Sequence, residues 1–197
     1  MRIFNLEDKA GKHFSFRDFI ECGETWLDLD AKGSSINNRP AQEASWLAIS
    51  QLAIVVLDPI ADIYGKPSLT YGFCSQTLAG LISKKPNPGI APQVDQHASC
   101  ELNTKGNAIC RHRGAACDFF IPDRESQMDK VALWIASNLQ FDAMYYYGRD
   151  RPLHISWGPA MRQMVVVMKT NVLDQRRQPS GNGRNARGVS LVNSVIY

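Results

Sequence analysis

The sequence predicts one α+β domain with a mainly antiparallel β-sheet flanked by helices. The chain has 197 residues, which is enough for one sizeable core and short for two. Hydrophobic residues make up 44% of it and charged residues 21%, the balance of a globular protein rather than of a disordered one. Helix-like and strand-like patterns follow one another in the order helix, strand, helix, strands, which is typical of the α+β class.

The N-terminal third is predicted to be mainly helical. Phenylalanines and an isoleucine at helical spacing indicate a short helix within residues 14–22. The Gly-, Ser- and Asn-rich residues 23–39 indicate a loop, and Asn38 at its end is a candidate helix cap. A wide apolar stripe over residues 46–57 then predicts a core helix, which Pro59 would bend or interrupt.

The rest of the domain is predicted to alternate short strands and helices. Residues 68–73 indicate a strand and residues 76–83 a helix, and the proline-rich residues 84–94 indicate a loop. Further along, strands are expected at residues 115–121, 141–147, 153–157 and 164–168, with a helix at residues 125–139. A turn at residues 103–107 predicts that the segment 98–113 forms a hairpin over the cleft.

The C-terminal residues differ in composition from the rest. We expect residues 1–172 to form the domain and residues 173–197 to be a basic, flexible tail, because Gly, Asn and Ser separate its arginines. An anionic polymer or nucleic acid would bind these arginines, which are Arg176, Arg177, Arg184 and Arg187. The formal net charge of the chain is only +3, which argues against a surface built throughout to hold nucleic acid.

Localisation is expected to be cytoplasmic, without a membrane span. The longest apolar run, Leu52–Leu57, is far shorter than the ~20 residues that cross a bilayer. The first residues carry charges too early for a secretory signal, so a cell-wall role would need a separate route of release. Five cysteines without such a signal predict reduced thiols, and the three between residues 100 and 117 lack the C-x-x-C pair of a second zinc site.

Histidines and one aspartate are the candidate metal ligands. Asp118 lies inside the apolar run AACDFFIP, where an aspartate is costly to bury unless a metal, an arginine or a backbone cap compensates it. His97, His112 and His154 could supply imidazoles beside it. A lone histidine on a strand, such as His154, is more often a structural residue than a ligand.

Several short motifs, in this order, resemble one family. They are Asn38–Pro40, Val56–Pro59, Tyr71–Ser75, Asp95–His97, Gly114–Asp118 and His154–Ser156. This order is similar to that of the zinc D-Ala-D-Ala carboxypeptidases and the phage L-alanyl-D-glutamate endopeptidases, which have the Hedgehog/DD-peptidase fold. The resemblance runs from about residue 14 to residue 158 and marks the chain as a divergent member.

The resemblance implies a zinc peptidase with one Zn²⁺ per chain. His97, Asp118 and His154 would be its ligands, and the substrate would be a peptide or a peptidoglycan fragment whose amide is hydrolysed. Zinc lowers the pKa of bound water to about 7. Asp150 would take the proton of that water, although it could equally be part of a solvated turn. Arg113 or Arg151 would stabilise the oxyanion or orient the substrate.

Departures from the family pattern favour alternatives, and the 84–94 loop and the arginine-rich tail have no counterpart in the family. Cys74 stands where the family has an arginine that holds a substrate carboxylate, and Arg151 stands where it has the catalytic acid. An insertion after His97 leaves His112 as an alternative ligand. A non-catalytic zinc scaffold that binds an anionic partner is therefore the rival interpretation, and a hydrolase of a non-wall amide or ester would use the same metal site.

Overall fold

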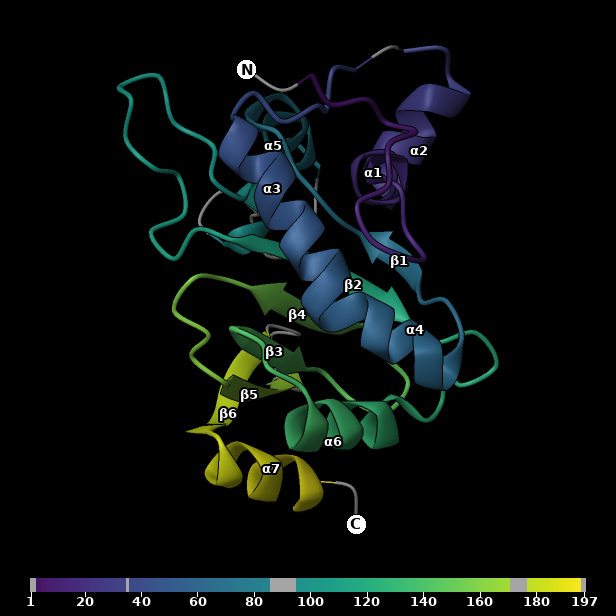
Figure 1. Ribbon diagram of the computed structural model, residues 1–197, viewed down its shortest axis with the longest axis vertical. Coiled ribbons are helices and arrows are strands. Elements are labelled where there is room, and N and C mark those ends of the chain that lie inside the picture. Colours follow the sequence, from purple (N-terminus) through teal and green to yellow (C-terminus); the bar gives the residue numbers. More distant parts are fainter. Residues whose placement is uncertain (1–2, 35, 86–94, 171–176, 196–197) are drawn as a thin grey trace.

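The fold is a six-stranded sheet with helices packed on it (Figure 1). The computed structural model describes residues 3–34, 36–85, 95–170 and 177–195. The strands, in the order β1-β2-β4-β3-β5-β6, are β1 Ser68–Tyr71, β2 Ala115–Phe120, β4 Leu153–Trp157, β3 Ala143–Tyr146, β5 Met164–Thr170 and β6 Arg177–Arg184. Every neighbouring pair is antiparallel except β3 and β5, which are parallel. The α+β class is confirmed, and the sheet is mixed rather than purely antiparallel.

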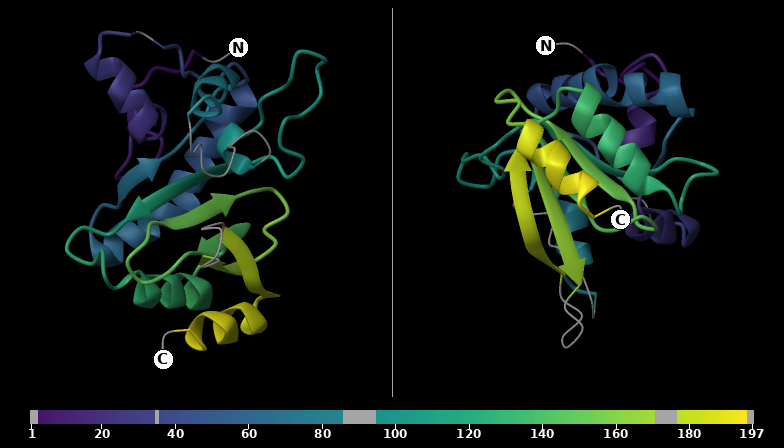
Figure 2. Two further views of the ribbon diagram at one scale, coloured as in Figure 1. Left: turned by 180° about the vertical axis from the view of Figure 1, so that it is seen from behind. Right: turned by 90° about the horizontal axis from the view of Figure 1, so that it is seen from below.

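The helices are α1 Phe16–Ile20, α2 Glu24–Ala31, α3 Glu43–Leu52, α4 Asp58–Tyr64, α5 Gln76–Ile82, α6 Met128–Asn138 and α7 Ala186–Asn193. Helices α1, α3, α4, α6 and α7 contribute to the main core on one face of the sheet, whereas α2 and α5 pack on each other around a smaller cluster. The continuous helix from α3 to α4 crosses β2 and β4, and the view from behind shows the strands in front of it (Figure 2). Alternate strand residues such as Cys117, Phe119 and Ile155 point toward this layer and are fully buried in the main core. The intervening residues, including Asp118 and His154, lie on the other face.

The helix that joins α3 to α4 passes through Pro59 without stopping. Between them, Ala53–Leu57 forms a π-helix, in which the Asp58 N–H donates to the carbonyl of Ala53 five residues back. The wider turn admits a proline, whose ring would clash with the preceding turn of a regular α-helix. Glu43–Tyr64 is long and apolar enough to cross a membrane, but 61% of its most apolar window is buried inside the protein, as in a core helix.

Two expectations for residues 23–39 were wrong. Glu24–Ala31 forms α2, within the segment that the sequence predicted to be a loop. Asn38 does not cap α3, because its buried side chain donates to the carbonyls of Ile20 and Phe73 and accepts from the Ser75 N–H. The buried carboxylate of Glu101 instead accepts the N–H groups of residues 41 and 42 at the start of α3.

The prediction of a flexible C-terminal tail was wrong for residues 177–193. These residues form β6, which pairs with β5, and α7, which packs on both strands and on α6. Val192 of α7 is fully buried. A Cβ atom at Gly181 or Gly188 would come within about 3 Å of the side chains of Leu191 and Val165, so the glycines provide close packing between α7 and the sheet. Arg184 and Arg187 are exposed, and Arg176 lies outside the described residues.

Candidate metal centre

Strand register places two predicted ligands directly opposite each other. Asp118 of β2 pairs with His154 of β4, and His154 pairs in turn with Tyr145 of β3. Directly opposed residues of antiparallel strands project on the same side with Cβ atoms about 5 Å apart. The side chains of Asp118 and His154 therefore meet on the face of the sheet opposite to the helix from α3 to α4.

The third predicted ligand, His97, comes from the one-turn 3₁₀-helix η3, Gln96–Ala98. The Asp95 carboxylate caps this turn by accepting the His97 N–H at 2.9 Å. The ring Nδ1 lies 2.7 Å from the carbonyl oxygen of Gly72, which can only accept, so Nδ1 carries the proton. The other ring nitrogen, Nε2, is then left without a proton in the neutral ring. Fixing the tautomer of a ligand through its second nitrogen is the usual way in which proteins orient metal-binding histidines.

The three ligand atoms converge on a common centre. His97 Nε2 lies 3.2 Å from His154 Nδ1, His154 Nδ1 lies 2.8 Å from Asp118 Oδ1, and His97 Nε2 lies 3.6 Å from Asp118 Oδ1. The circle through these atoms has a radius of about 1.9 Å, slightly less than the ~2.0–2.1 Å from zinc to a nitrogen or carboxylate ligand. One ion of that size can reach all three atoms. The cluster could therefore hold a metal ion.

Burial and charge act on the cluster in opposite directions. Burial alone would lower the pKa of His97, but the carboxylates of Asp95 and Asp118 outweigh it and raise that pKa to about 9. Burial would raise the pKa of Asp118, but hydrogen bonds with His154 and His97 hold it well below its usual range. The side chains of His97 and His154 are 3% and 8% exposed, against 29% for Asp118, so the cluster is most accessible from the Asp118 side.

The remaining predicted site residues do not contact this cluster. Asp150 and Arg151 lie in the exposed turn before β4, where the charge of Asp150 acts on Tyr146, a residue of the opposite, helix-covered face. Arg113 is exposed, and its backbone carbonyl accepts from the Gln96 side chain at 2.6 Å. His112 lies beside Arg162 and Arg111, so it is His97 that joins Asp118 and His154.

The inserted segment between His97 and Gly114 supplies no second metal cluster among the residues that the structure describes. Its turn forms a small antiparallel bridge between Leu102 and Ala108, and all five cysteines of the chain are free thiols. Cys117 points into the main core, where burial raises the pKa of its thiol well above the usual value. The cysteines of this segment therefore pack in the protein as thiols and are not part of a metal cluster among the described residues.

Two tyrosines, neither of which the sequence predicted to be a site residue, border the metal cluster. The Tyr71 ring lies edge-on to His97 with centroids 4.6 Å apart, and the Tyr145 ring lies edge-on to His154 at 5.1 Å. The next residue, Tyr146, points the other way and is buried in the core. Residues 145–147 are all tyrosine, so only the register with β4 identifies the one that faces the histidine.

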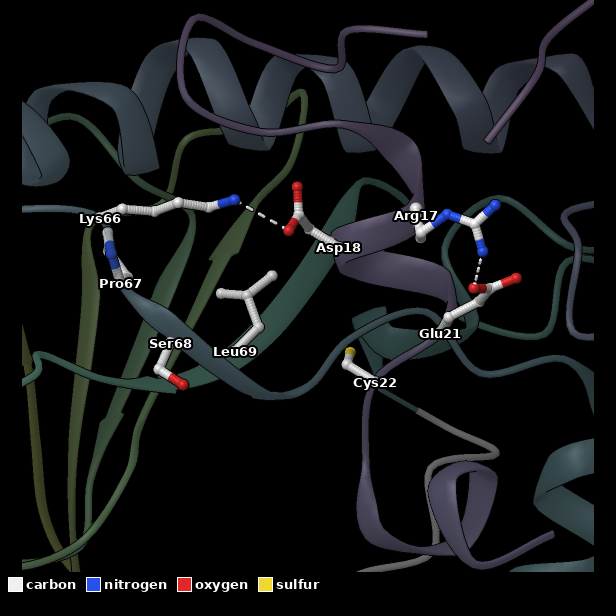
Figure 3. Close-up of a pocket in the computed structure, with 8 residues that line it drawn as sticks. All are labelled: Arg17, Asp18, Glu21, Cys22, Lys66, Pro67, Ser68 and Leu69. Atoms are coloured by element: carbon white, nitrogen blue, oxygen red, sulfur yellow. Dashed lines mark hydrogen bonds and ion pairs between the residues drawn. The ribbon is translucent and has the colours of Figure 1, made fainter. Parts of the chain in front are cut away.

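A separate surface hollow of about 510 Å³ lies beside α1 and the edge strand β1 (Figure 3). Its charged side chains are paired, Lys66 with Asp18 at 2.9 Å and Arg17 with Glu21. Burial raises the pKa of Cys22, at its inner side, to about 12, so this thiol is protonated at neutral pH. The hollow therefore offers neither a free charge nor a thiolate, and the metal cluster is the stronger candidate site.

Comparisons with known proteins leave the family open. No family model matches the chain, and no curated protein or solved structure is significantly similar to it. The geometry of the cluster itself is therefore the basis on which a function can be assigned.

Proposed function

We propose that the protein is a zinc-dependent hydrolase that cleaves an amide bond in a peptide of the peptidoglycan type. The observation that carries the proposal is the convergence of two imidazole nitrogens and one carboxylate oxygen on a centre of metal-binding size. Two histidines and a carboxylate form a known ligand set of catalytic zinc, which leaves a fourth position for water. Zinc bound there would supply an activated water and polarise the scissile carbonyl.

The residues of this chain would prepare the site in three ways. The Gly72 carbonyl fixes the tautomer of His97, so that its Nε2 is available to the metal. Asp118 supplies a negative charge that favours binding of a cation, and its side chain is the most exposed of the three. Tyr145, packed against the His154 ring, limits the space beside that ligand.

Two carboxylates are candidates for accepting the proton of the water. Asp150 was favoured by its place in the sequence, four residues before His154, but it lies in the exposed turn whose charge acts on Tyr146. The Asp95 carboxylate lies beside the cluster, because one of its oxygens accepts the His97 N–H at 2.9 Å and its charge acts on the rings of His97 and Tyr71. We therefore assign the proton-accepting role to Asp95. Asp95→Asn should lower kcat while metal content stays at the wild-type level, and Asp150→Asn should leave both unchanged.

The decisive experiment is the metal content of purified wild-type protein beside matched histidine variants. One zinc per chain is expected in the wild type, with loss in His97→Ala and His154→Ala and retention in His112→Ala. The His112 variant controls for removal of an imidazole near the same face. Zinc-loaded wild type is then assayed on peptidoglycan fragments. A wild type that binds no metal after zinc is supplied would contradict the proposal.

The rival function, a metal-stabilised binding protein without catalysis, is favoured by one observation. Arg151 occupies the position at which the similar family has its acid, and neither it nor Asp150 contacts the cluster. An anionic partner would bind the exposed Arg184 and Arg187. Its affinity would fall steeply with salt, and Arg184→Gln with Arg187→Gln would flatten that dependence. Zinc binding without hydrolysis, together with such salt-dependent binding, would favour this alternative.

A further inference from the structure

A second polar cluster, at one end of the same sheet, holds an arginine in a fixed orientation. Arg162 lies in the connection from β4 to β5, and the carboxylate of Asp142, just before β3, accepts three of its contacts. These are Nη2 to Oδ2 at 2.6 Å, Nε to Oδ1 at 3.0 Å and the backbone N–H to Oδ1 at 3.1 Å. Asp142 is 1% exposed and Arg162 21%, so a buried anion anchors a partly accessible cation.

The anchoring leaves part of the guanidinium unused. Of its five N–H groups, Asp142 accepts the one on Nε and one on Nη2, and His112 Nε2 accepts one on Nη1 at 3.2 Å. One N–H on each terminal nitrogen remains without an acceptor among the described residues. A pair of such groups on one guanidinium is the arrangement that binds a carboxylate or a phosphate through two hydrogen bonds.

The surroundings of Arg162 carry a net positive charge. His112 Nε2 also accepts from Arg111 Nε at 3.3 Å, so one imidazole joins two guanidinium groups. Burial and the charges of both arginines lower the pKa of His112, which is therefore neutral at neutral pH. With two arginines and one carboxylate, this cluster has an excess of one positive charge.

The backbone around Arg162 is strained in a way that fixes its position. Met161 and Gln163, on either side of it, have φ angles of 41° and 50°, values that residues other than glycine rarely adopt. The Gln163 side chain accepts the Phe141 N–H at 2.7 Å, which ties this connection to the residue before Asp142. The chain therefore keeps an unfavourable conformation at the residue that presents the guanidinium.

Arg162 and the metal cluster are joined through Tyr145. The Tyr145 ring packs on His154, and its hydroxyl is close enough to act electrostatically on Arg162. Continuing the β3–β4 register by one residue beyond the Ala143–Ser156 pair places Asp142 opposite Trp157, three residues along β4 from His154. The Cα atoms of His154 and Trp157 are then about 10 Å apart along β4, about three residues of extended peptide. A Cβ atom at Gly158 would meet both the Gln96 side chain and the Asp142 carboxylate, so Asp142 also lies beside the residue that precedes His97.

We infer that Arg162, with His112 and Arg111, forms an oxyanion subsite that binds a carboxylate of the substrate about three residues from the bond cleaved at the metal cluster. The inference deepens the proposed function and rests on it for the position of that bond. This subsite predicts that the substrate is an acidic peptide. Binding of the anion itself depends only on Arg162 and its neighbours.

The test is a titration of metal-free protein followed by NMR at the Arg162 amide and the His112 ring. The probes are acetyl-trialanine with a free carboxylate, the same peptide with a C-terminal amide, and inorganic phosphate. The carboxylate should bind at least about tenfold more tightly than the amide, as expected for two charge-assisted hydrogen bonds. Equal affinity of the two peptides would overturn the inference. Binding of phosphate without any carboxylate preference would assign the subsite to phosphorylated ligands and overturn the acidic-peptide substrate.

The variants separate the subsite from folding and from metal binding. Arg162→Gln alone leaves Asp142 buried without its partner, so it is combined with Asp142→Asn, and this double variant should lose the carboxylate preference. Arg124→Gln, which changes an exposed arginine between β2 and α6, should retain it. His97→Ala should also retain it, because Arg162 is not a metal ligand. A protein that binds the carboxylate but no metal would overturn the proposed function alone, whereas loss of preference in Arg124→Gln would overturn the subsite.

Discussion

The metal cluster and the Asp142–Arg162 pair are two polar groups on one sheet, and they differ in whether their members satisfy one another. In the Asp142–Arg162 pair, each carboxylate oxygen meets N–H donors of the same arginine. In the metal cluster, two ring nitrogens and a carboxylate oxygen all face a common centre, and the proton of His97 is already used by Gly72. The Asp142–Arg162 pair is complete as an ion pair, with two guanidinium N–H groups left over for an anion, whereas the three converging atoms of the metal cluster can all bind one ion.

This difference separates a pair that stabilises the fold by itself, and could bind an anion in addition, from three residues whose ligand atoms converge on one centre. A buried ion pair with full hydrogen bonding holds its segments together, and removing one partner leaves the other uncompensated. In the metal cluster, protons shared with the Asp118 carboxylate hold the two ring nitrogens beside it, and a bound metal ion would replace those protons. We therefore expect the two clusters to respond in opposite ways to mutation and to zinc.

The largest effect is expected from breaking the complete pair. Asp142→Ala should lower the free energy of unfolding by about 3 kcal/mol or more, because the Arg162 guanidinium loses its buried partner. Urea unfolding of metal-free protein measures the change. Asp62→Ala is the control, since its partner Lys12 is exposed, and it should cost less than about 1 kcal/mol. Similar losses in both variants would contradict the distinction between the two clusters.

The pH dependence of the Asp142→Ala effect sharpens this prediction. Burial would raise the pKa of Asp142, but the hydrogen bonds and the charge of Arg162 outweigh it and lower that pKa below the unfolded value. A lowered folded-state pKa gives stability that is present above the unfolded pKa of about 3.9 and is lost as the pH falls through the folded value. The difference between wild type and Asp142→Ala should therefore shrink below about pH 4. A constant difference down to acidic pH would show that packing, not charge, causes it.

The second largest effect is expected from filling the incomplete cluster. Zinc at one hundred times its dissociation constant should stabilise the wild type by about 2.7 kcal/mol, because it binds the folded state alone. Thermal unfolding with zinc and with a chelator measures this shift. Asp118→Asn should lose it, because an amide is a poor replacement for the carboxylate ligand. An equal zinc shift in Asp118→Asn would exclude the proposed ligand set.

Much of the metal cluster could be predicted from the sequence, and its neighbours could not. Asp118 in an apolar strand is a costly placement that demands a partner, and the alternation around His154 indicates one face of a strand. The motif order selected His97, but the contact of His97 with Asp118 and His154 depends on the register of β2 with β4 and on the position of η3. The role of Arg162 could not be predicted from the sequence. It depends on Asp142, which is twenty residues away along the chain and becomes buried beside Arg162 only when the chain folds.

The C-terminal segment shows why composition alone misleads. Glycines, serines and asparagines between arginines usually mean a mobile segment, because they offer little apolar surface. Here the missing side chains of Gly181 and Gly188 let α7 approach the sheet, and Val192 then completes the core. Such packing depends on contacts between residues far apart in sequence, which local composition does not contain.

A smaller loss of stability is expected when Arg162 is replaced by lysine, which keeps the positive charge but lacks the planar guanidinium. Arg162→Lys should cost about 1 kcal/mol, because an ammonium cannot form the paired contacts from Nε and Nη2 to Asp142. Urea unfolding beside Asp142→Ala gives the comparison. A loss as large as in Asp142→Ala would mean that the paired geometry, rather than charge compensation, provides most of the stability.

The smallest effect is expected at His112, an imidazole that the sequence offered as an alternative metal ligand. It contacts Arg162 but neither Asp118 nor His154, and its two arginine contacts are long. His112→Ala should therefore change the free energy of unfolding by less than about 0.5 kcal/mol. It should leave the zinc-induced shift intact, since a third histidine that is no ligand has nothing to contribute to it. Loss of that shift in His112→Ala would show that His112, rather than His97, binds the metal. The two clusters would then form one site.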